Sequence, residues 1–211
     1  MKKYILLLAL LLSSTTFAVE PKFNDNFKQT KNEIETSSPG KIEVLELFWY
    51  GCIHCYSMDP YLDKWADSLP DDVVFKRVPA IPRKSWVPGA KAYFALETLG
   101  LEGKLHEKLF DAIHKGKDVD PNNEAALISW ITLNGKLDEK EVKAAFNSFS
   151  IDTKLKKSYK IFKEAGATGV PTIIIDGNYM TSSTMAGGEK NAIDITNYII
   201  ENIRNDRKKS N

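Results

Sequence analysis

The sequence predicts an α/β fold in which two β-containing parts are separated by a block of helices. Three observations support this prediction. Residues 41–50 form a strand-like segment that is apolar on both faces. Residues 172–176 form a second, β-branched segment far along the chain. Between about residues 88 and 166 no strand pattern occurs, and the pattern is helical.

The first β-containing part begins with the segment 41–50. Its apolar side chains alternate between two faces, with Val44 and Phe48 on one and Leu45, Leu47 and Trp49 on the other. Because neither face is polar, we expect a central strand that is covered on both sides.

A helix is predicted directly after this strand. Its apolar residues recur three and four positions apart, at Cys55, Met58, Leu62, Trp65 and Leu69. Pro60 lies inside the pattern and is expected to kink the helix. Residues 72–78 are typical of the next strand, which would lie parallel to the first in a βαβ unit.

The helical block is predicted to hold five helices. Their expected ranges are 90–99, 102–114, 120–133, a fourth that begins at Asp138, and 153–165. Asp120 and Pro121 are expected to be the N-cap and first residue of the third helix. Asp138 and Glu141 resemble a capping box. Gly166 is expected to end the fifth helix.

The last part returns to strands. Residues 172–176 and 179–181 are predicted strands joined by a turn at Gly177 and Asn178, and residues 189–204 form a closing amphipathic helix. This order describes a thioredoxin fold with a helical insertion domain. The expected boundaries are residues 19–87 for the first part of the thioredoxin fold, 88–166 for the insertion and 167–211 for the second part.

Residues 1–18 are typical of a cleaved bacterial secretory signal peptide. Lys2 and Lys3 precede a nine-residue apolar stretch, and Thr16 and Ala18 occupy the −3 and −1 positions of a cleavage site. The alternative is a membrane anchor, but this apolar stretch is short for a bilayer. Cleavage would change the formal net charge from +1 to −1, which does not favour a nucleic acid or membrane partner.

Cys52 and Cys55 are the only cysteines in the chain. The pair cannot form a four-cysteine zinc site, and we expect no metal. Cys52 would lie at the N-terminus of a helix, which favours a thiolate, whereas Cys55 would point to the apolar face. We therefore expect Cys52 to be the attacked sulfur and Cys55 the resolving one. A static structural disulfide is the alternative, but it would close too short a loop to add much stability.

Three segments carry a resemblance to a known family. They are Glu46-Leu47-Phe48, Cys52-Ile53-His54-Cys55-Tyr56 and Gly169-Val170-Pro171-Thr172. With them the chain resembles the DsbA family of thiol:disulfide oxidoreductases. The resemblance implies donation of a disulfide to exported, folding proteins in the periplasm and reoxidation by a DsbB-like, quinone-linked membrane oxidase. This reaction requires no metal or organic cofactor, and we expect the protein to be a monomer.

Two polar residues are expected to support the cysteines. A cationic or N–H-donating His54 would stabilise the Cys52 thiolate, although an exposed histidine without a role is the alternative. Glu46 shares a buried strand face, so it should titrate at high pH and handle protons near Cys55. The alternative for Glu46 is a strand-end acid that reaches solvent. Glu43, nearer that end of the strand, is expected to be exposed.

The resemblance also implies a substrate-binding surface. It implies that the bond between Val170 and Pro171 is cis and faces the cysteines, where the backbone of Val170 pairs with an extended peptide. An ordinary trans proline in a turn is the alternative. Ile53 replaces the proline that is commonest at this position and is expected to contact substrate. His106 and His114 are expected to be core or surface residues without a role.

Two other functions fit the same residues. One is a periplasmic disulfide reductase or isomerase that a different membrane partner keeps reduced. The other is a binding module for unfolded chains in which the thiol pair is incidental. A redox titration of the Cys52–Cys55 pair distinguishes the three functions.

Overall fold

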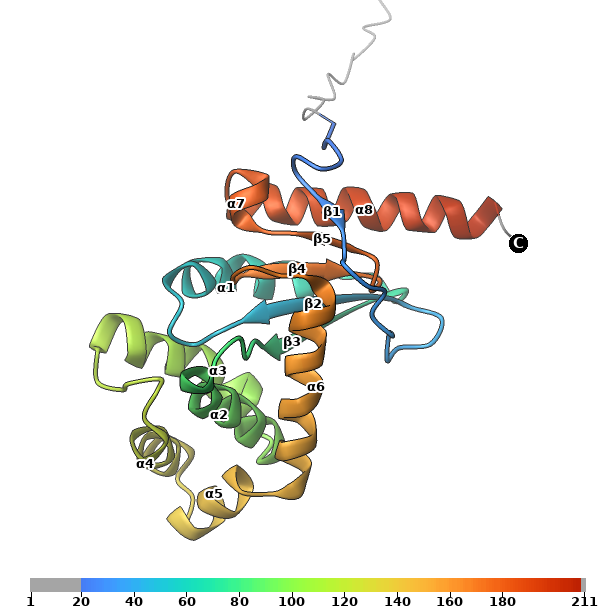
Figure 1. The fold of residues 1–211 in the computed structure, drawn as a ribbon. Coiled ribbons are helices and arrows are strands. Elements are labelled where there is room, and N and C mark those ends of the chain that lie inside the picture. Colours follow the sequence, from blue (N-terminus) through green and yellow to red (C-terminus); the bar gives the residue numbers. More distant parts are fainter. Residues whose placement is uncertain (1–19, 210–211) are drawn as a thin grey trace, which may run out of the picture.

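The computed structural model describes residues 20–209 and has a single five-stranded sheet within that range (Figure 1). The strands are β1 (Lys28–Gln29), β2 (Ile42–Phe48), β3 (Val73–Pro79), β4 (Thr172–Ile175) and β5 (Tyr179–Thr181), in the order β1-β5-β4-β2-β3. The expected signal peptide lies outside the described residues. No helix among residues 20–209 combines the length and apolar character needed to cross a bilayer.

Strand β2 lies inside the sheet, as the sequence predicted. All seven of its residues are buried. It pairs in parallel with β3 and antiparallel with β4, so the segments before and after the helical block meet on its two sides. Strand β1, which pairs with β5, was not predicted because two residues are too few to show a period.

Helices cover both faces of the sheet (Figure 1). On one face, α1 (Ile53–Ala66) and α8 (Glu189–Lys209) share a core with Val44, Ile173 and Ile175. On the other face, Leu45, Leu47 and Ile174 share a core with residues of α6 (Phe149–Ala165). The alternation along β2 therefore serves two separate hydrophobic cores. Helix α1 begins just after Cys52 and continues through Pro60.

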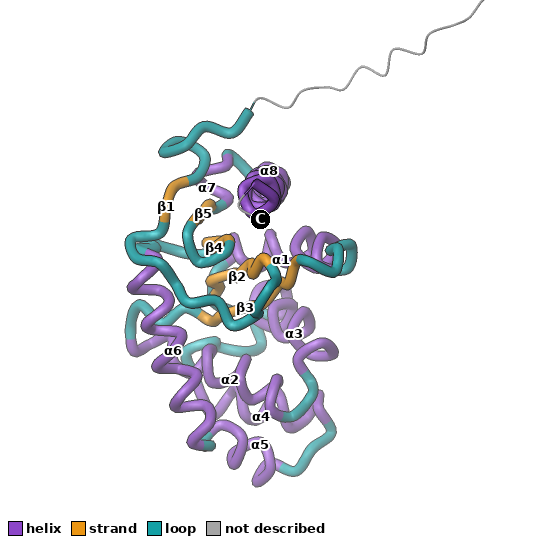
Figure 2. Tube along the Cα trace, turned by 90° about the vertical axis from the view of Figure 1, so that its right-hand side faces the viewer, coloured by secondary structure: helices purple, strands orange, loops and turns teal. Residues whose placement is uncertain are grey.

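The helical block lies beyond the β3 edge of the sheet (Figure 2). It contains α2 (Val87–Thr98), α3 (Glu102–Asp111), a π-helical turn η2 (Ala112–Gly116), α4 (Glu124–Gly135), α5 (Glu139–Phe146) and α6, and a short 3-10 turn η1 (Lys84–Trp86) precedes it. Its core extends to Phe48, Tyr50 and Cys55. The block is thus packed directly against the segment that carries the cysteines.

Several predicted helix boundaries were wrong. Helix α4 begins after Asn123, whose side chain accepts from the N–H of Ala126, while Asp120 instead closes a turn with the N–H of Asn122. Helix α6 begins four residues earlier than predicted, after Ser148. Both errors have one cause, since several Asp, Asn and Ser residues in these loops could cap a helix and the sequence does not rank them. Gly166 ends α6 in a left-handed conformation, as predicted.

The C-terminal ends of the first and last helices also differ from the prediction. Leu69 follows the end of α1 instead of continuing it. Helix α8 extends to Lys209, beyond the expected end, and its Arg204 forms a bidentate ion pair with Asp72. A further short helix, α7 (Ser183–Ala186), precedes α8.

The prediction that Glu43 is exposed was wrong, because it is 2% exposed. Its carboxylate accepts from Lys76 at 2.7 Å and from the hydroxyl groups of Ser37 and Ser38 at 2.9 Å. Burial acts to raise the pKa of Glu43, but these donors outweigh it and the pKa lies below its ordinary value. Partners from neighbouring segments therefore compensate for the buried charge.

Candidate active site

Cys52 and Cys55 are free thiols at the start of α1. Cys52 is the N-cap residue in an extended conformation, and its Sγ accepts from the backbone N–H of Cys55 at 3.3 Å. Cys52 is partly exposed, whereas Cys55 is fully buried. The expected asymmetry between an accessible sulfur and a covered one is confirmed.

The surroundings of the two thiols move their pKa values apart. The pKa of Cys52 falls to about 6, mainly because the Cys55 thiol donates a hydrogen bond to it. Burial opposes this fall, while the backbone N–H groups of His54 and Cys55 and the His54 charge add to it. Burial raises the pKa of Cys55 well above its ordinary value, and the negative charges of Cys52 and Glu46 raise it further. Near neutral pH the pair therefore holds one thiolate, on Cys52.

The loop before β4 lies against the accessible sulfur. The Val170–Pro171 bond is cis, as the resemblance implied. The Cys52 thiol donates to the carbonyl oxygen of Val170 at 3.3 Å. Val170 is partly exposed, so its backbone borders both Cys52 and solvent. The structure thus brings together residues that are 118 positions apart in sequence.

Glu46 is a buried acid on β2, with 1% of its surface exposed. Burial raises its pKa to about 8, and the charges of Asp59, Asp63 and Cys52 also raise it. The Arg77 guanidinium opposes this rise from an Nε to Oε2 distance of 3.3 Å. That ion pair is not aligned as a hydrogen bond, since both atoms lack a hydrogen-bond partner. A proton on Glu46 is therefore stable near neutral pH.

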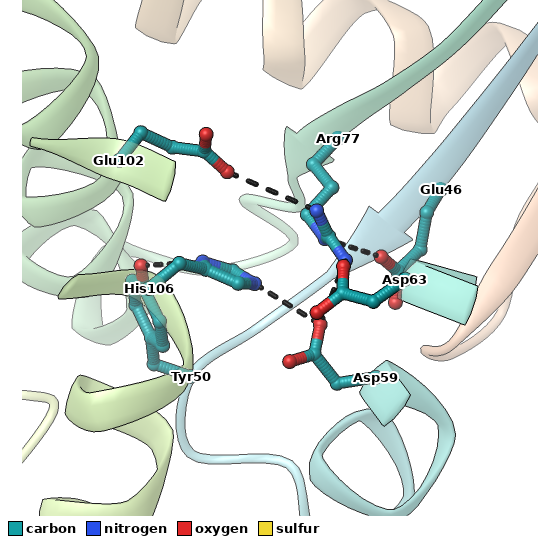
Figure 3. Close-up of polar contacts among 7 residues, drawn as sticks. All are labelled: Glu46, Tyr50, Asp59, Asp63, Arg77, Glu102 and His106. Atoms are coloured by element: carbon teal, nitrogen blue, oxygen red, sulfur yellow. Dashed lines mark hydrogen bonds and ion pairs between the residues drawn. The ribbon is translucent and has the colours of Figure 1, made fainter. Parts of the chain in front are cut away.

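Arg77 of β3 is the centre of a buried charge cluster (Figure 3). Its guanidinium faces four carboxyl groups, those of Glu46, Asp59, Asp63 and Glu102. Asp59 is 2% exposed and accepts from Arg77 at 3.0 Å. One cation is thus shared by four acids, and their ionisation states depend on one another.

His54 and Ile53 occupy the exposed first turn of α1. The Ile53 side chain is 54% exposed beside Cys52, an uncommon position for a large apolar residue. His54 is also exposed and contributes its backbone N–H and its charge to the Cys52 thiolate. Both positions are compatible with contact to a bound peptide.

The structure gives His106 and His114 contacts that sequence reasoning missed. His106 is buried and lies 2.8 Å from the Tyr50 hydroxyl and 3.2 Å from Asp59. His114 lies 2.7 Å from the Tyr50 carbonyl oxygen and stacks on Tyr56. Their eight-residue spacing places both on similar faces of a helical segment, which was the available signal. Among residues 20–209 no group of three or more His, Cys, Asp or Glu side chains is arranged to hold a metal ion.

Comparison with known proteins identifies the family of this chain. The family model of the DsbA-like thioredoxin domain matches residues 62–194. The chain belongs to the DsbA family. It is 36% identical over 184 residues to the thiol:disulfide interchange protein DsbA of Azotobacter vinelandii, covering 87% of this chain and 85% of that one. It is 33% identical to DsbA of Pseudomonas aeruginosa strain PAO1, covering 97% and 99% of the two chains.

Solved DsbA structures share the fold. The crystal structure of Pseudomonas aeruginosa DsbA aligns with a TM-score of 0.80 at 33% identity, covering 89% of this chain and 97% of that one. DsbA of Xylella fastidiosa aligns with a TM-score of 0.81 at 28% identity, covering 87% and 98%. The chain is therefore a thiol:disulfide oxidoreductase with the DsbA form of the thioredoxin fold, in which helices are inserted between β3 and β4.

Proposed function

We propose that this DsbA-family protein donates a Cys52–Cys55 disulfide to reduced, folding proteins. The observation that carries the proposal is the difference between the two thiols. Cys52 is accessible and has a pKa of about 6, whereas Cys55 is buried and has a raised pKa. A sulfur that is stable as a thiolate is a good leaving group, so a disulfide through Cys52 is readily passed on.

The exchange proceeds in two steps. A substrate thiolate attacks Sγ of Cys52, the bond between the two enzyme sulfurs breaks, and the electron pair stays on Sγ of Cys55. A second substrate thiolate then attacks the substrate sulfur of the mixed disulfide and expels Cys52 as a thiolate. The substrate loses two electrons and gains a disulfide, and the enzyme gains both thiols in reduced form.

Glu46 supplies the proton that the first step requires. The new Cys55 thiolate is buried, where its charge is unfavourable, so it takes up a proton. Glu46 is buried nearby and has a pKa of about 8. The negative charge of Glu46 also raises the pKa of Cys55. Transfer from Glu46 to Cys55 leaves the carboxylate beside Arg77.

Substrate binding is assigned to the exposed surface around Cys52. The backbone of Val170, beside Pro171, pairs with an extended peptide, and Ile53 and His54 contact its side chains. The protein acts as a monomer in the periplasm after removal of residues 1–18. A DsbB-like, quinone-linked membrane oxidase restores the disulfide after each turnover.

A redox equilibrium with glutathione tests the proposal. We expect the Cys52–Cys55 pair to be mostly reduced in a buffer whose glutathione poise keeps ordinary structural disulfides intact. A pair that stays oxidised in that buffer would indicate a reductase or isomerase. If a Cys52→Ser, Cys55→Ser double variant still protects unfolded chains from aggregation as wild type does, the binding module is the better description.

A further inference from the structure

Two histidines of one helical segment hold both polar ends of Tyr50. The Tyr50 hydroxyl lies 2.8 Å from Nδ1 of His106 in α3, and the Tyr50 carbonyl oxygen lies 2.7 Å from Nε2 of His114 in η2. Tyr50 precedes Cys52 by two residues. The segment that leads into the redox pair is therefore attached to the helical insertion.

His106 also reaches the charge cluster from its other ring nitrogen (Figure 3). Its Nε2 lies 3.2 Å from Oδ1 of Asp59, the oxygen that accepts from Arg77 at 3.0 Å. Asp59 is one helical turn beyond Cys55 on α1. His106, Tyr50 and Asp59 are 4%, 1% and 2% exposed, so water does not compete for these contacts. His106 thus bridges the segments on both sides of the cysteines.

The partners of His106 indicate which ring nitrogen serves which group. Nε2 donates to the Asp59 carboxylate, which can only accept, at 3.2 Å. Nδ1 and the Tyr50 hydroxyl share the second hydrogen bond at 2.8 Å. Asp59 therefore receives an N–H from His106 as well as one from Arg77.

The His106 N–H has a specific effect in a cluster with few cations. Within residues 20–209, Arg77 faces four carboxyl groups, so the acid with the least compensation keeps its proton. The groups around His106 and Arg77 that carry or can carry charge are Glu46 on β2, Tyr50 and Cys52 before α1, Cys55, Asp59 and Asp63 on α1, Tyr93 on α2 and Glu102 on α3. Asp59 receives the His106 N–H and Glu46 does not.

We propose that His106 is a positioning residue for thiol–disulfide exchange, which holds Asp59 ionised against Arg77 and so makes Glu46 the acid that carries the proton for Cys55. The inference rests on the proposed function, because it concerns the proton of the first exchange step. His106 touches neither thiol and acts only through Asp59 and Tyr50. The helical insertion thereby contributes to the chemistry of a site that is built on the thioredoxin part.

Replacement of His106 should change the titration of Glu46. Without the Nε2 donor the charge on Asp59 is less stabilised, so Asp59 competes with Glu46 for the proton, and the Asp59 charge that raises the pKa of Glu46 is weakened. In His106→Leu the midpoint at which Glu46 loses its proton should fall by at least about half a pH unit. The measurement is infrared titration of the protonated carboxyl band in the reduced protein, with the band assigned by its loss in Glu46→Gln.

Two conservative variants separate the contacts of His106. The amide nitrogen of His106→Gln can occupy the Nε2 position and donate to Asp59, so its midpoint should match wild type. His106→Asn can accept from Tyr50 but does not reach Asp59, so its midpoint should fall as in His106→Leu. Phe110→Leu is the packing control, because Phe110 packs on the His106 ring at 5.1 Å and should lower stability without moving the midpoint.

Each other result overturns the inference. An unchanged midpoint in folded His106→Leu would show that His106 does not act on Glu46. Equal shifts in the Gln and Asn variants would exclude the Asp59 contact as the cause. A higher midpoint would mean that Asp59 stays ionised without His106 and draws more of the Arg77 charge, so that His106 does not select Glu46 as the protonated acid. The proposed function itself is tested on wild-type protein by the glutathione equilibrium, so its failure is distinguishable from all three results.

Discussion

The thiol of Cys52 lies 3.3 Å from the carbonyl oxygen of Val170, to which it donates a hydrogen bond. Ionisation of Cys52 removes this donor, because a thiolate can only accept. The thiolate is stabilised instead by the N–H of Cys55 and the Cys55 thiol. Cys52 also lacks an S–H in the enzyme disulfide and in the mixed disulfide, so the carbonyl group of Val170 is free of this donor while a peptide is bound.

The roles of the two cysteines can be separated by trapping. In Cys55→Ser, the Cys52 thiolate should attack a disulfide-containing substrate peptide, release one peptide thiolate and hold the other half as a mixed disulfide that accumulates, because Cys55 is no longer there to attack it. In Cys52→Ser, buried Cys55 should form none. Non-reducing electrophoresis and mass spectrometry of the adducts check this. Adducts linked through Cys55 would reverse the assignment.

The stability difference between reduced and oxidised protein should depend on pH. The pKa of Cys52 falls from an ordinary value of 9.0 to about 6 in the folded protein. Between these pH values the unfolded reduced chain keeps the Cys52 proton that the folded protein has lost, so the contribution of Cys52 to the stability of the reduced form rises with pH. This contribution is lost as pH falls through about 6, and the oxidised form lacks it.

Paired urea melts at pH 5 and pH 8 measure this difference. The reduced form should gain stability relative to the oxidised form at pH 8, and the gain should shrink in His54→Ala. An oxidised form that is clearly more stable at pH 8 would contradict disulfide donation and favour the reductase.

Glu46→Gln should stabilise the reduced protein at high pH. The folded wild type keeps the Glu46 proton up to a pKa of about 8, whereas the ordinary value is 4.5, so the contribution of Glu46 to wild-type stability falls with pH across this interval. Glutamine has no proton to lose. Because one pH unit corresponds to about 1.4 kcal/mol, the gain at pH 9 should reach a few kcal/mol. Urea melts at pH 5 and pH 9 check it, and an equal effect at both would contradict the buried-acid assignment.

The proton role of Glu46 has a separate kinetic consequence. Glu46→Gln should slow the attack of a substrate peptide on the Cys52–Cys55 disulfide by about 10- to 100-fold. This factor lies at the low end of the rate effects of general acid catalysis. Stopped-flow tryptophan fluorescence measures this step. Asp63→Asn is the matched control, because Asp63 also contacts Arg77 but its side chain is 49% exposed.

Arg77→Met should be strongly destabilising. It leaves four carboxyl groups around a side-chain site that is only 10% exposed, without their shared cation. Loss of one partner from a buried ion pair costs about 3–5 kcal/mol. Arg83→Met is the control, because Arg83 is exposed and contacts the Trp86 ring at 5.4 Å, so it should cost less than about 1 kcal/mol. Urea denaturation measures the loss of unfolding free energy in both variants. Similar losses would contradict the stabilising role of Arg77 among the four carboxyl groups.

Gly51→Ala should disturb the segment before Cys52. A Cβ at residue 51 would lie 2.4 Å from the ring of Trp49, which stacks on Trp86 at 4.2 Å. The ring must shift, so we expect the free energy of unfolding to fall by about 1–3 kcal/mol and the near-UV circular dichroism signal to change. Gly103→Ala in α3 meets no atom within 4 Å and should be neutral or stabilising by about 0.5–1 kcal/mol. An unchanged melting temperature in Gly51→Ala would contradict this reasoning.

The sequence predicted the features that depend on local pattern. The two apolar faces of β2, the helix after Cys52 and the burial of Cys55 follow from periodicity, and Glu46 was found because it interrupts an apolar face. The burial of Glu43 was not predictable, since its compensation comes from Lys76 and two serines on other segments. The contacts of His106 and His114 depend on how α3 docks on Tyr50, and periodicity contains no information about docking.

The order of strands in the sheet also determines when the site is completed. Strand β2 borders β3, which follows it closely in sequence, and β4, which lies beyond the whole helical block. If the chain enters the periplasm from its N-terminus, in line with the proposed removal of residues 1–18, Cys52 and Cys55 arrive there before Val170. During that interval no carbonyl of Val170 adjoins Cys52 and α8 does not cover α1. A nascent chain therefore carries its own thiols unprotected, and is itself a potential substrate for completed copies of the enzyme.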